Sequence, residues 1–77
     1  MFSSPVAIRL PDGTTRDVAS VRKASELLMD VDWPGERDDR HEAALDACLK
    51  VLDGHRSVED GREAFMEAAR SAGILAG

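Results

Sequence analysis

The sequence predicts an α+β fold in which an N-terminal two-stranded β-hairpin packs on three α-helices, in the order ββααα. Apolar and polar residues alternate near the N-terminus, which is the pattern of a half-buried strand. Three later segments instead repeat apolar residues every three or four positions, which is the pattern of amphipathic helices. Residues that commonly cap helices or close turns separate these segments. A chain of 77 residues is expected to form a single domain, 1–77.

The predicted hairpin spans about residues 5–19. Val6, Ile8 and Leu10 fall on one face of its first strand. The segment Pro11–Gly13 suits a tight turn, since proline fixes φ and glycine tolerates a positive φ. An isolated hairpin is marginal in water, so its apolar face must lie on the helices. Both outer edges of the hairpin are expected to be unpaired.

The first helix is predicted over residues 21–32. Ser20 is placed to cap its N-terminus. Pro34 ends the helix by Asp32 or Trp33, because the residue before a proline avoids helical geometry. The apolar face of this helix contains Val21, Ala24, Leu27, Leu28 and Val31.

The second helix is predicted over residues 40–53. Asp39, with Glu42 three residues later, is typical of a capping box, and Gly54 ends the helix. The apolar residues spread over a wide arc, so this helix is expected at the centre of the domain, with neighbours on more than one side. They are Ala44, Leu45, Ala47, Cys48, Leu49, Val51 and Leu52.

The third helix is predicted over residues 58–72, with Ser57 as its N-cap and Gly73 at its C-terminal end. Gly61 interrupts this helix at a cost of up to about 1 kcal/mol against alanine. We interpret it as a point of close packing against the second helix. The apolar stripe contains Val58, Gly61, Phe65, Ala68, Ala72 and Leu75.

Charge and composition exclude several kinds of partner. The chain has 10 basic and 15 acidic residues and a formal net charge of −5 at pH 7. Nucleic acid and anionic membrane surfaces attract positively charged proteins, so neither is expected as a partner. No apolar run reaches the length of a membrane span, and the N-terminus lacks the pattern of a signal peptide. The single cysteine excludes an internal disulfide, so a reducing cytoplasm is the expected compartment.

Few residues of the chain belong to a pattern that indicates catalysis or metal binding. No phosphate-binding loop, nucleophile elbow or zinc-protease motif occurs, so no cofactor is expected. Residues 30–36 resemble the start of a calcium loop, but Pro34 has no side-chain oxygen at the fifth position and His41 replaces the acid at the twelfth. Cys48, His41 and His55 form too small a set for zinc. Cys48 lies within an apolar stripe, which favours a buried hydrophobic role. We therefore expect no metal site and no catalytic residue.

Two arginines of the third helix leave an alternative open. Arg62 and Arg70 lie two turns apart and could together receive an anion. Pairing with Glu59 and Glu67, three residues before each arginine, is the favoured interpretation.

Trp33 is the only tryptophan and precedes a proline. It is either a lid that closes the core between the first two helices or an exposed anchor for a partner, since tryptophan is common in both roles. Pro34 and Met29 would widen such a contact patch.

Motifs over most of the chain resemble a family of small alphaproteobacterial proteins known as domain of unknown function 982. The resemblance is carried by Pro5-Val6, Trp33-Pro34, Ala44-Leu45-x-x-Cys48-x-x-x-Leu52-x-Gly54 and Arg62-x-Ala64-Phe65-x-x-Ala68-Ala69-x-x-Ala72-Gly73-Ile74. It implies a compact α+β domain in a bacterial cytoplasm. It implies no reaction, cofactor or catalytic residue.

The leading interpretation is a non-enzymatic module that recognises another protein or associates with itself. A marginally small core and open strand edges favour it, because open edges invite pairing with another strand. The partner is expected to be a protein, and a homo-oligomer stays open. The alternative is a small-molecule-binding or enzymatic domain with a pocket near Trp33, Cys48 and His41. That alternative requires a concave site that holds a titratable group of shifted pKa.

Overall fold

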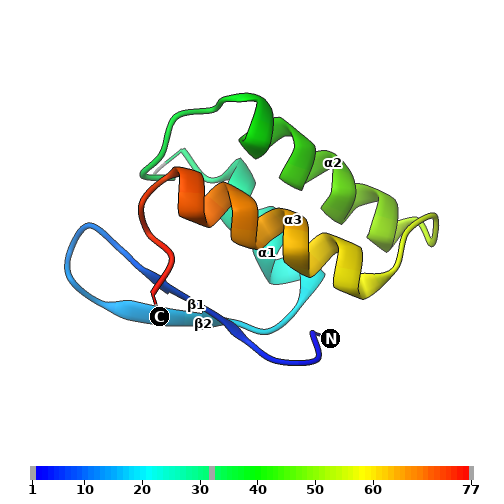
Figure 1. Ribbon diagram of the computed structural model, residues 1–77, viewed down its shortest axis with the longest axis horizontal. Coiled ribbons are helices and arrows are strands. Elements are labelled where there is room, and N and C mark those ends of the chain that lie inside the picture. The colour runs from blue at the N-terminus through cyan, green and yellow to red at the C-terminus, as the bar shows by residue number, and fades with distance from the viewer. Residues whose placement is uncertain (1, 32, 77) are drawn as a thin grey trace.

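The computed structural model describes residues 2–31 and 33–76 and has the predicted ββααα order. A β-hairpin lies beneath a layer of three helices, with α2 and α3 side by side and α1 behind them (Figure 1). The elements are β1 (Val6–Arg9), β2 (Thr15–Val18), α1 (Val21–Met29), α2 (Asp39–Leu52) and α3 (Val58–Ser71). The α+β prediction is therefore confirmed.

The two strands pair antiparallel, and their register decides which side chains face the helices. Val6 lies opposite Val18, and Ile8 lies opposite Arg16. Val6 and Ile8 are buried, as the alternation predicts, whereas Leu10 is only half-buried. Val18 of β2 is buried as well. Gly13 closes the turn with a φ of +90°, a backbone conformation that residues with a Cβ adopt at a cost.

The C-terminal segment covers the outer edge of β1. The Arg9 amide donates to the Ile74 carbonyl at 2.7 Å, and the Ala76 amide donates to the Ala7 carbonyl at 2.9 Å. Gly73, with a φ of +74°, turns the chain out of α3 toward the hairpin (Figure 1). The prediction of two unpaired edges is therefore wrong for β1. Among residues 2–31 and 33–76, the outer edge of β2 has no strand paired with it.

Helix α1 ends at Met29, earlier than the predicted 21–32, and residue 32 lies outside the described residues. Side chains from the following connection satisfy its last carbonyls. The Arg37 guanidinium donates to the carbonyls of Leu28 (3.1 Å) and Asp30 (2.7 Å). These bonds replace the helical bonds that the carbonyls would otherwise need. Val31, predicted on the buried face, consequently lies beyond the helix and is 89% exposed.

Helix α2 is capped one residue earlier than predicted. The Asp38 carboxylate, rather than that of Asp39, accepts the His41 amide at 3.0 Å. Its other oxygen accepts the Ser71 hydroxyl at 3.0 Å, which ties the start of α2 to the end of α3. This second bond is available only to Asp38, and it distinguishes two adjacent aspartates that local sequence makes equivalent. The predicted caps Ser20 and Ser57 are confirmed.

The core lies between the hairpin and the three helices. Its largest fully buried side chains come one from each of the five elements and are Phe65, Ile8, Leu28, Val18 and Cys48. Helix α2 packs on both α1 and α3, as predicted. It lies on the side of the helical layer away from the hairpin, however, so the prediction that it occupies the centre of the domain is wrong (Figure 1). The outer part of its wide apolar arc is solvent-exposed, however, at Leu49 and Leu52. No helix among the described residues combines the length and the apolar character needed to cross a bilayer.

The prediction of close packing at Gly61 is confirmed. A Cβ at this position would lie 3.1 Å from a Val51 methyl of α2 and 3.3 Å from a Val21 methyl of α1. The absent side chain lets all three helices approach one another at this point.

Candidate interaction site

Trp33 belongs to the core. The residue is 8% exposed. Its ring meets the His41 ring edge-on at 5.6 Å between centroids and the Phe65 ring at 6.1 Å. Such edge-to-face contacts add about 0.5–1.5 kcal/mol per pair to the burial of the rings. Trp33 is therefore the predicted lid on the core and not an exposed anchor. Pro34 and Met29 are exposed, and contact of any of these three residues with a partner stays a prediction.

His41 has a structural role in this cluster. Its Nε2 lies 2.7 Å from the Leu28 carbonyl oxygen, and the residue is buried. A carbonyl can only accept, so Nε2 carries the proton in this bond. His41 and Arg37 thus bind the same carbonyl at the end of α1. The bonds hold the connection between α1 and α2 against the helix that precedes it.

The Asp38 carboxylate is held in its ionised form. The His41 amide and then the Ser71 hydroxyl lower its pKa below the ordinary value, because both donate to the carboxylate. One oxygen of this carboxylate caps α2, and the other binds Ser71 of α3. The negative charge of Asp38 therefore has a structural role.

Cys48 is fully buried, which confirms its predicted role as a buried hydrophobic residue. Burial raises the pKa of its thiol to about 11, because an apolar environment disfavours the thiolate. The thiol is protonated at neutral pH, whereas nucleophilic cysteines require the thiolate. Of the three residues in the alternative prediction, the structure brings Trp33 and His41 together. Cys48 does not line the cleft beside Trp33.

We expect native Cys48 to react with a thiol reagent at pH 8 at least about 100-fold more slowly than Cys48 in the unfolded chain, because reaction requires transient opening. Absorbance after addition of a disulfide reagent, with and without urea, measures the two rates. Comparable rates would show that the thiol is accessible in the native state.

Metal-ligating residues do not converge within the described part of the chain. No three His, Cys, Asp or Glu side chains lie close enough there to hold an ion. In the segment that resembles a calcium loop, the Asp30 carbonyl accepts from Arg37. Residue 32, the third position of that segment, lies outside the described residues.

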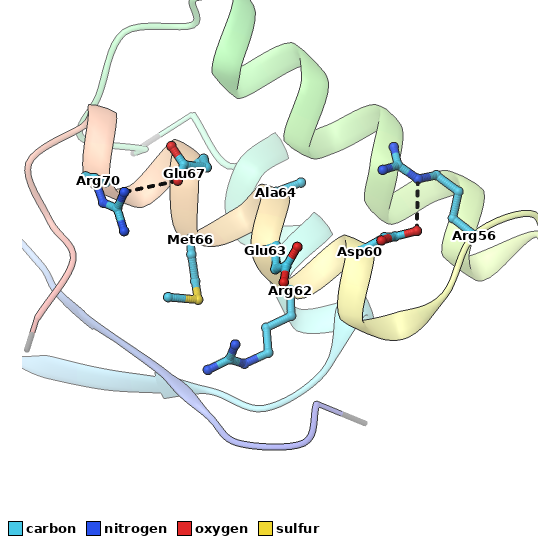
Figure 2. Close-up of a pocket in the computed structure, with 8 residues that line it drawn as sticks. All are labelled: Arg56, Asp60, Arg62, Glu63, Ala64, Met66, Glu67 and Arg70. Carbon is cyan, nitrogen blue, oxygen red and sulfur yellow. Dashed lines mark hydrogen bonds and ion pairs between the residues drawn. The ribbon is translucent and has the colours of Figure 1, made fainter.

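A surface depression of about 490 Å³ runs along the outer side of α3 (Figure 2). Its charged side chains balance, with three arginines and three acids. Arg56 pairs with Asp60 at 3.7 Å and Arg70 with Glu67 at 3.1 Å. The depression therefore has no excess charge to attract an ionic ligand. Its lining residues are Arg56, Asp60, Arg62, Glu63, Ala64, Met66, Glu67 and Arg70.

Arg62 points from α3 toward the N-terminal segment (Figure 2). It pairs with Glu59 at 3.2 Å and donates to the carbonyl and hydroxyl oxygens of Ser4 at 3.0 and 2.9 Å. The favoured pairings of the two arginines, with Glu59 and Glu67, are confirmed. Arg62 fastens the start of the chain to α3.

A smaller cleft of about 190 Å³ opens beside Trp33, between the hairpin and the end of α1. Its walls are mostly apolar, and one cation and one anion lie among them. Of the residues around this cleft, the sequence indicated only Trp33 and Pro34 as contacts for a partner. The lining residues are Ile8, Leu10, Arg16, Leu27, Asp30, Trp33 and Pro34.

The fold and this site define a small ββααα domain in which the buried histidine and cysteine serve the core, while one strand edge and one apolar cleft face solvent. The family model described as a protein of unknown function (DUF982) matches residues 4–76, and the chain belongs to this family. The resemblance in the sequence is confirmed. The chain is also similar to Agrobacterium tumefaciens protein Atu1219, known from an NMR structure, at 36% identity and a TM-score of 0.82. The match covers 99% of this chain and 75% of that one. No curated protein matches the chain.

Proposed function

We propose that this domain is a non-enzymatic protein-interaction module of the bacterial cytoplasm, which binds a partner protein along the open edge of β2 and in the cleft beside Trp33. The main support for this proposal is that the open edge of β2 and the cleft lie next to each other. Arg16 belongs to β2 and also lines the cleft. An added strand would therefore place side chains over the cleft while its backbone pairs with β2.

The dimensions of the cleft support a protein partner over a small molecule. Its volume of about 190 Å³ is below the ~300–1,000 Å³ of typical small-molecule pockets. It suits one or two apolar side chains. The titratable candidates of the alternative function, Cys48 and His41, lie buried in the core and line no part of it.

The substitution Thr15→Pro is expected to abolish binding while the domain stays folded. Thr15 is the first residue of β2, where a proline is tolerated, and its amide points away from β1. Proline removes a donor that only an added strand would use, and its ring obstructs that strand. Thr15→Ala keeps the donor and is the matched control.

Capture from a lysate of the host organism tests the proposal. A partner protein should be retained by the wild type and by Thr15→Ala, and at least about tenfold less by Thr15→Pro. Circular dichroism and melting temperature verify the fold of each variant. Equal retention by Thr15→Pro would contradict the proposal. So would turnover of a metabolite that is lost when Cys48 or His41 is replaced in a folded variant.

A further inference from the structure

The register of the hairpin shows which backbone groups β2 offers to a partner. In an antiparallel pair, residues alternately bind the neighbouring strand and point away from it. On β1 the outward groups are those of Ala7 and Arg9, which bind the C-terminal segment. Their partners across the hairpin are Asp17 and Thr15. The amides and carbonyls of Thr15 and Asp17 therefore point outward from β2, and neither is bonded within the described chain.

The side chains of β2 add a pattern of charge to this edge. Arg16, opposite Ile8, faces the helices and the cleft, whereas Asp17, opposite Ala7, faces the other side of the sheet. Both are exposed, and among the described residues neither side chain has a hydrogen bond or an ion pair within 4.0 Å, although the Asp12 carboxylate lies within electrostatic reach of Arg16. An incoming strand meets a cation on the helix side and an anion on the solvent side.

This pattern disfavours a second copy of the chain as the occupant. A two-fold symmetric antiparallel pairing of two β2 strands must be centred on one residue, so that outward groups meet outward groups. Centring on Arg16 places the two arginines directly opposite each other. Centring on Asp17 does the same for the two aspartates. Like charges directly opposite each other destabilise a sheet. Centring on Thr15 avoids both contacts but brings the strand against the turn at Gly13.

We infer that the partner presents an extended segment of a different protein, with an acidic side chain opposite Arg16, a basic side chain opposite Asp17 and an apolar side chain in the cleft. The inference rests on the proposed function and specifies its partner. The acid and the apolar residue are two positions apart, because alternate side chains of a strand share a face. The apolar side chain meets Leu10, Leu27 and Trp33, which line the cleft.

A pair of peptides tests this specificity. The matched peptide is Thr-Leu-Lys-Glu-Lys-Leu-Thr, whose palindromic order presents the same pattern in either strand direction. The charge-swapped peptide is Thr-Leu-Glu-Lys-Glu-Leu-Thr. Titration followed by amide NMR should show the matched peptide shifting the Thr15 and Asp17 resonances. It should bind roughly tenfold more tightly than the swapped peptide, since each opposite-charge pair contributes modestly.

The double substitution Arg16→Asp with Asp17→Arg controls for net charge, because it exchanges the two charges and leaves their sum unchanged. It should reverse the preference between the peptides. Equal affinities, an unreversed preference or unchanged Thr15 and Asp17 resonances up to millimolar peptide would each overturn the inference. If these resonances shift with protein concentration in the absence of peptide, the edge of β2 binds a second copy of the chain. That result would also overturn the inference. If Thr15→Pro still abolishes capture of a host protein in any of these cases, the proposed function stands and only the partner class is wrong.

Discussion

Replacing Trp33 by alanine is expected to lower the free energy of unfolding by about 3–5 kcal/mol, the usual cost of truncating a buried aromatic side chain. The residue is 8% exposed and packs against the His41 and Phe65 rings. A domain of this size has a total stability of roughly 4–12 kcal/mol at ~0.05–0.15 kcal/mol per residue. The substitution therefore removes about a quarter of the stability or more. Urea denaturation followed by circular dichroism measures it, since the variant has no tryptophan fluorescence.

Met29→Ala is the matched control. Met29 is close in sequence but 53% exposed, so its truncation should change the stability by no more than about 0.5 kcal/mol. Similar losses in the two variants would show that the Trp33 ring does not fill the core. The comparison also bears on binding experiments. Loss of a partner by Trp33→Ala would report unfolding, so a change on the strand edge such as Thr15→Pro is the cleaner probe of the site.

The parts of the fold that sequence predicts well are those fixed by neighbouring residues. Ser20 and Ser57 each bind an amide three residues ahead, so the signal for the cap lies within one turn of helix. The alternation of Val6 and Ile8 with polar residues likewise fixes the buried face of β1. Each of these features depends on a short segment of the chain, so the residue types within that segment are enough to predict it.

The parts that sequence misses depend on residues far apart in the chain. The edge of β1 is closed by Ile74 and Ala76, more than sixty residues away. The end of α1 is set by Arg37 and His41, whose role follows only from where the connection folds back. One feature of the sequence could have indicated that the C-terminal segment packs on the hairpin. It is the pair of apolar residues Ile74 and Leu75 after Gly73.

The candidate site was predicted only in part for the same reason. The residue types of Trp33, Pro34 and Met29 indicated a contact patch. Two of these residues, Trp33 and Pro34, line the cleft. Arg16 and Leu27 come from β2 and α1, and no spacing in the sequence relates them to Trp33. The cleft exists because the connection after α1 returns over the hairpin, a tertiary arrangement without a local motif.

That connection passes α3 so closely that Gly35→Ala is expected to destabilise the domain by about 1–3 kcal/mol, the usual cost of overpacking. A Cβ at Gly35 would lie 2.4 Å from the Ala72 Cβ, 3.0 Å from the Ala72 Cα and 3.1 Å from Trp33 Nε1. The Ala72 Cα belongs to the backbone at the end of α3, so it cannot turn aside as a flexible side chain would. Either the connection or the C-terminal turn of α3 must shift, and the Trp33 ring is displaced with it. Urea denaturation of the variant measures the loss.

Two variants separate this clash from a general effect of alanine. Gly61→Ala meets only the side-chain methyls of Val51 and Val21 at 3.1 and 3.3 Å. It also gains about 1 kcal/mol of helix propensity, so its net effect should be smaller than that of Gly35→Ala. Ala72→Gly removes the nearest atom of the clash. The double variant Gly35→Ala with Ala72→Gly should lose less stability than the two single variants together. The difference in the free energy of unfolding should be about 0.5 kcal/mol or more, as expected for residues in direct contact. Strict additivity would show that Gly35 and Ala72 are not in contact, and that the connection lies farther from α3 than this packing requires.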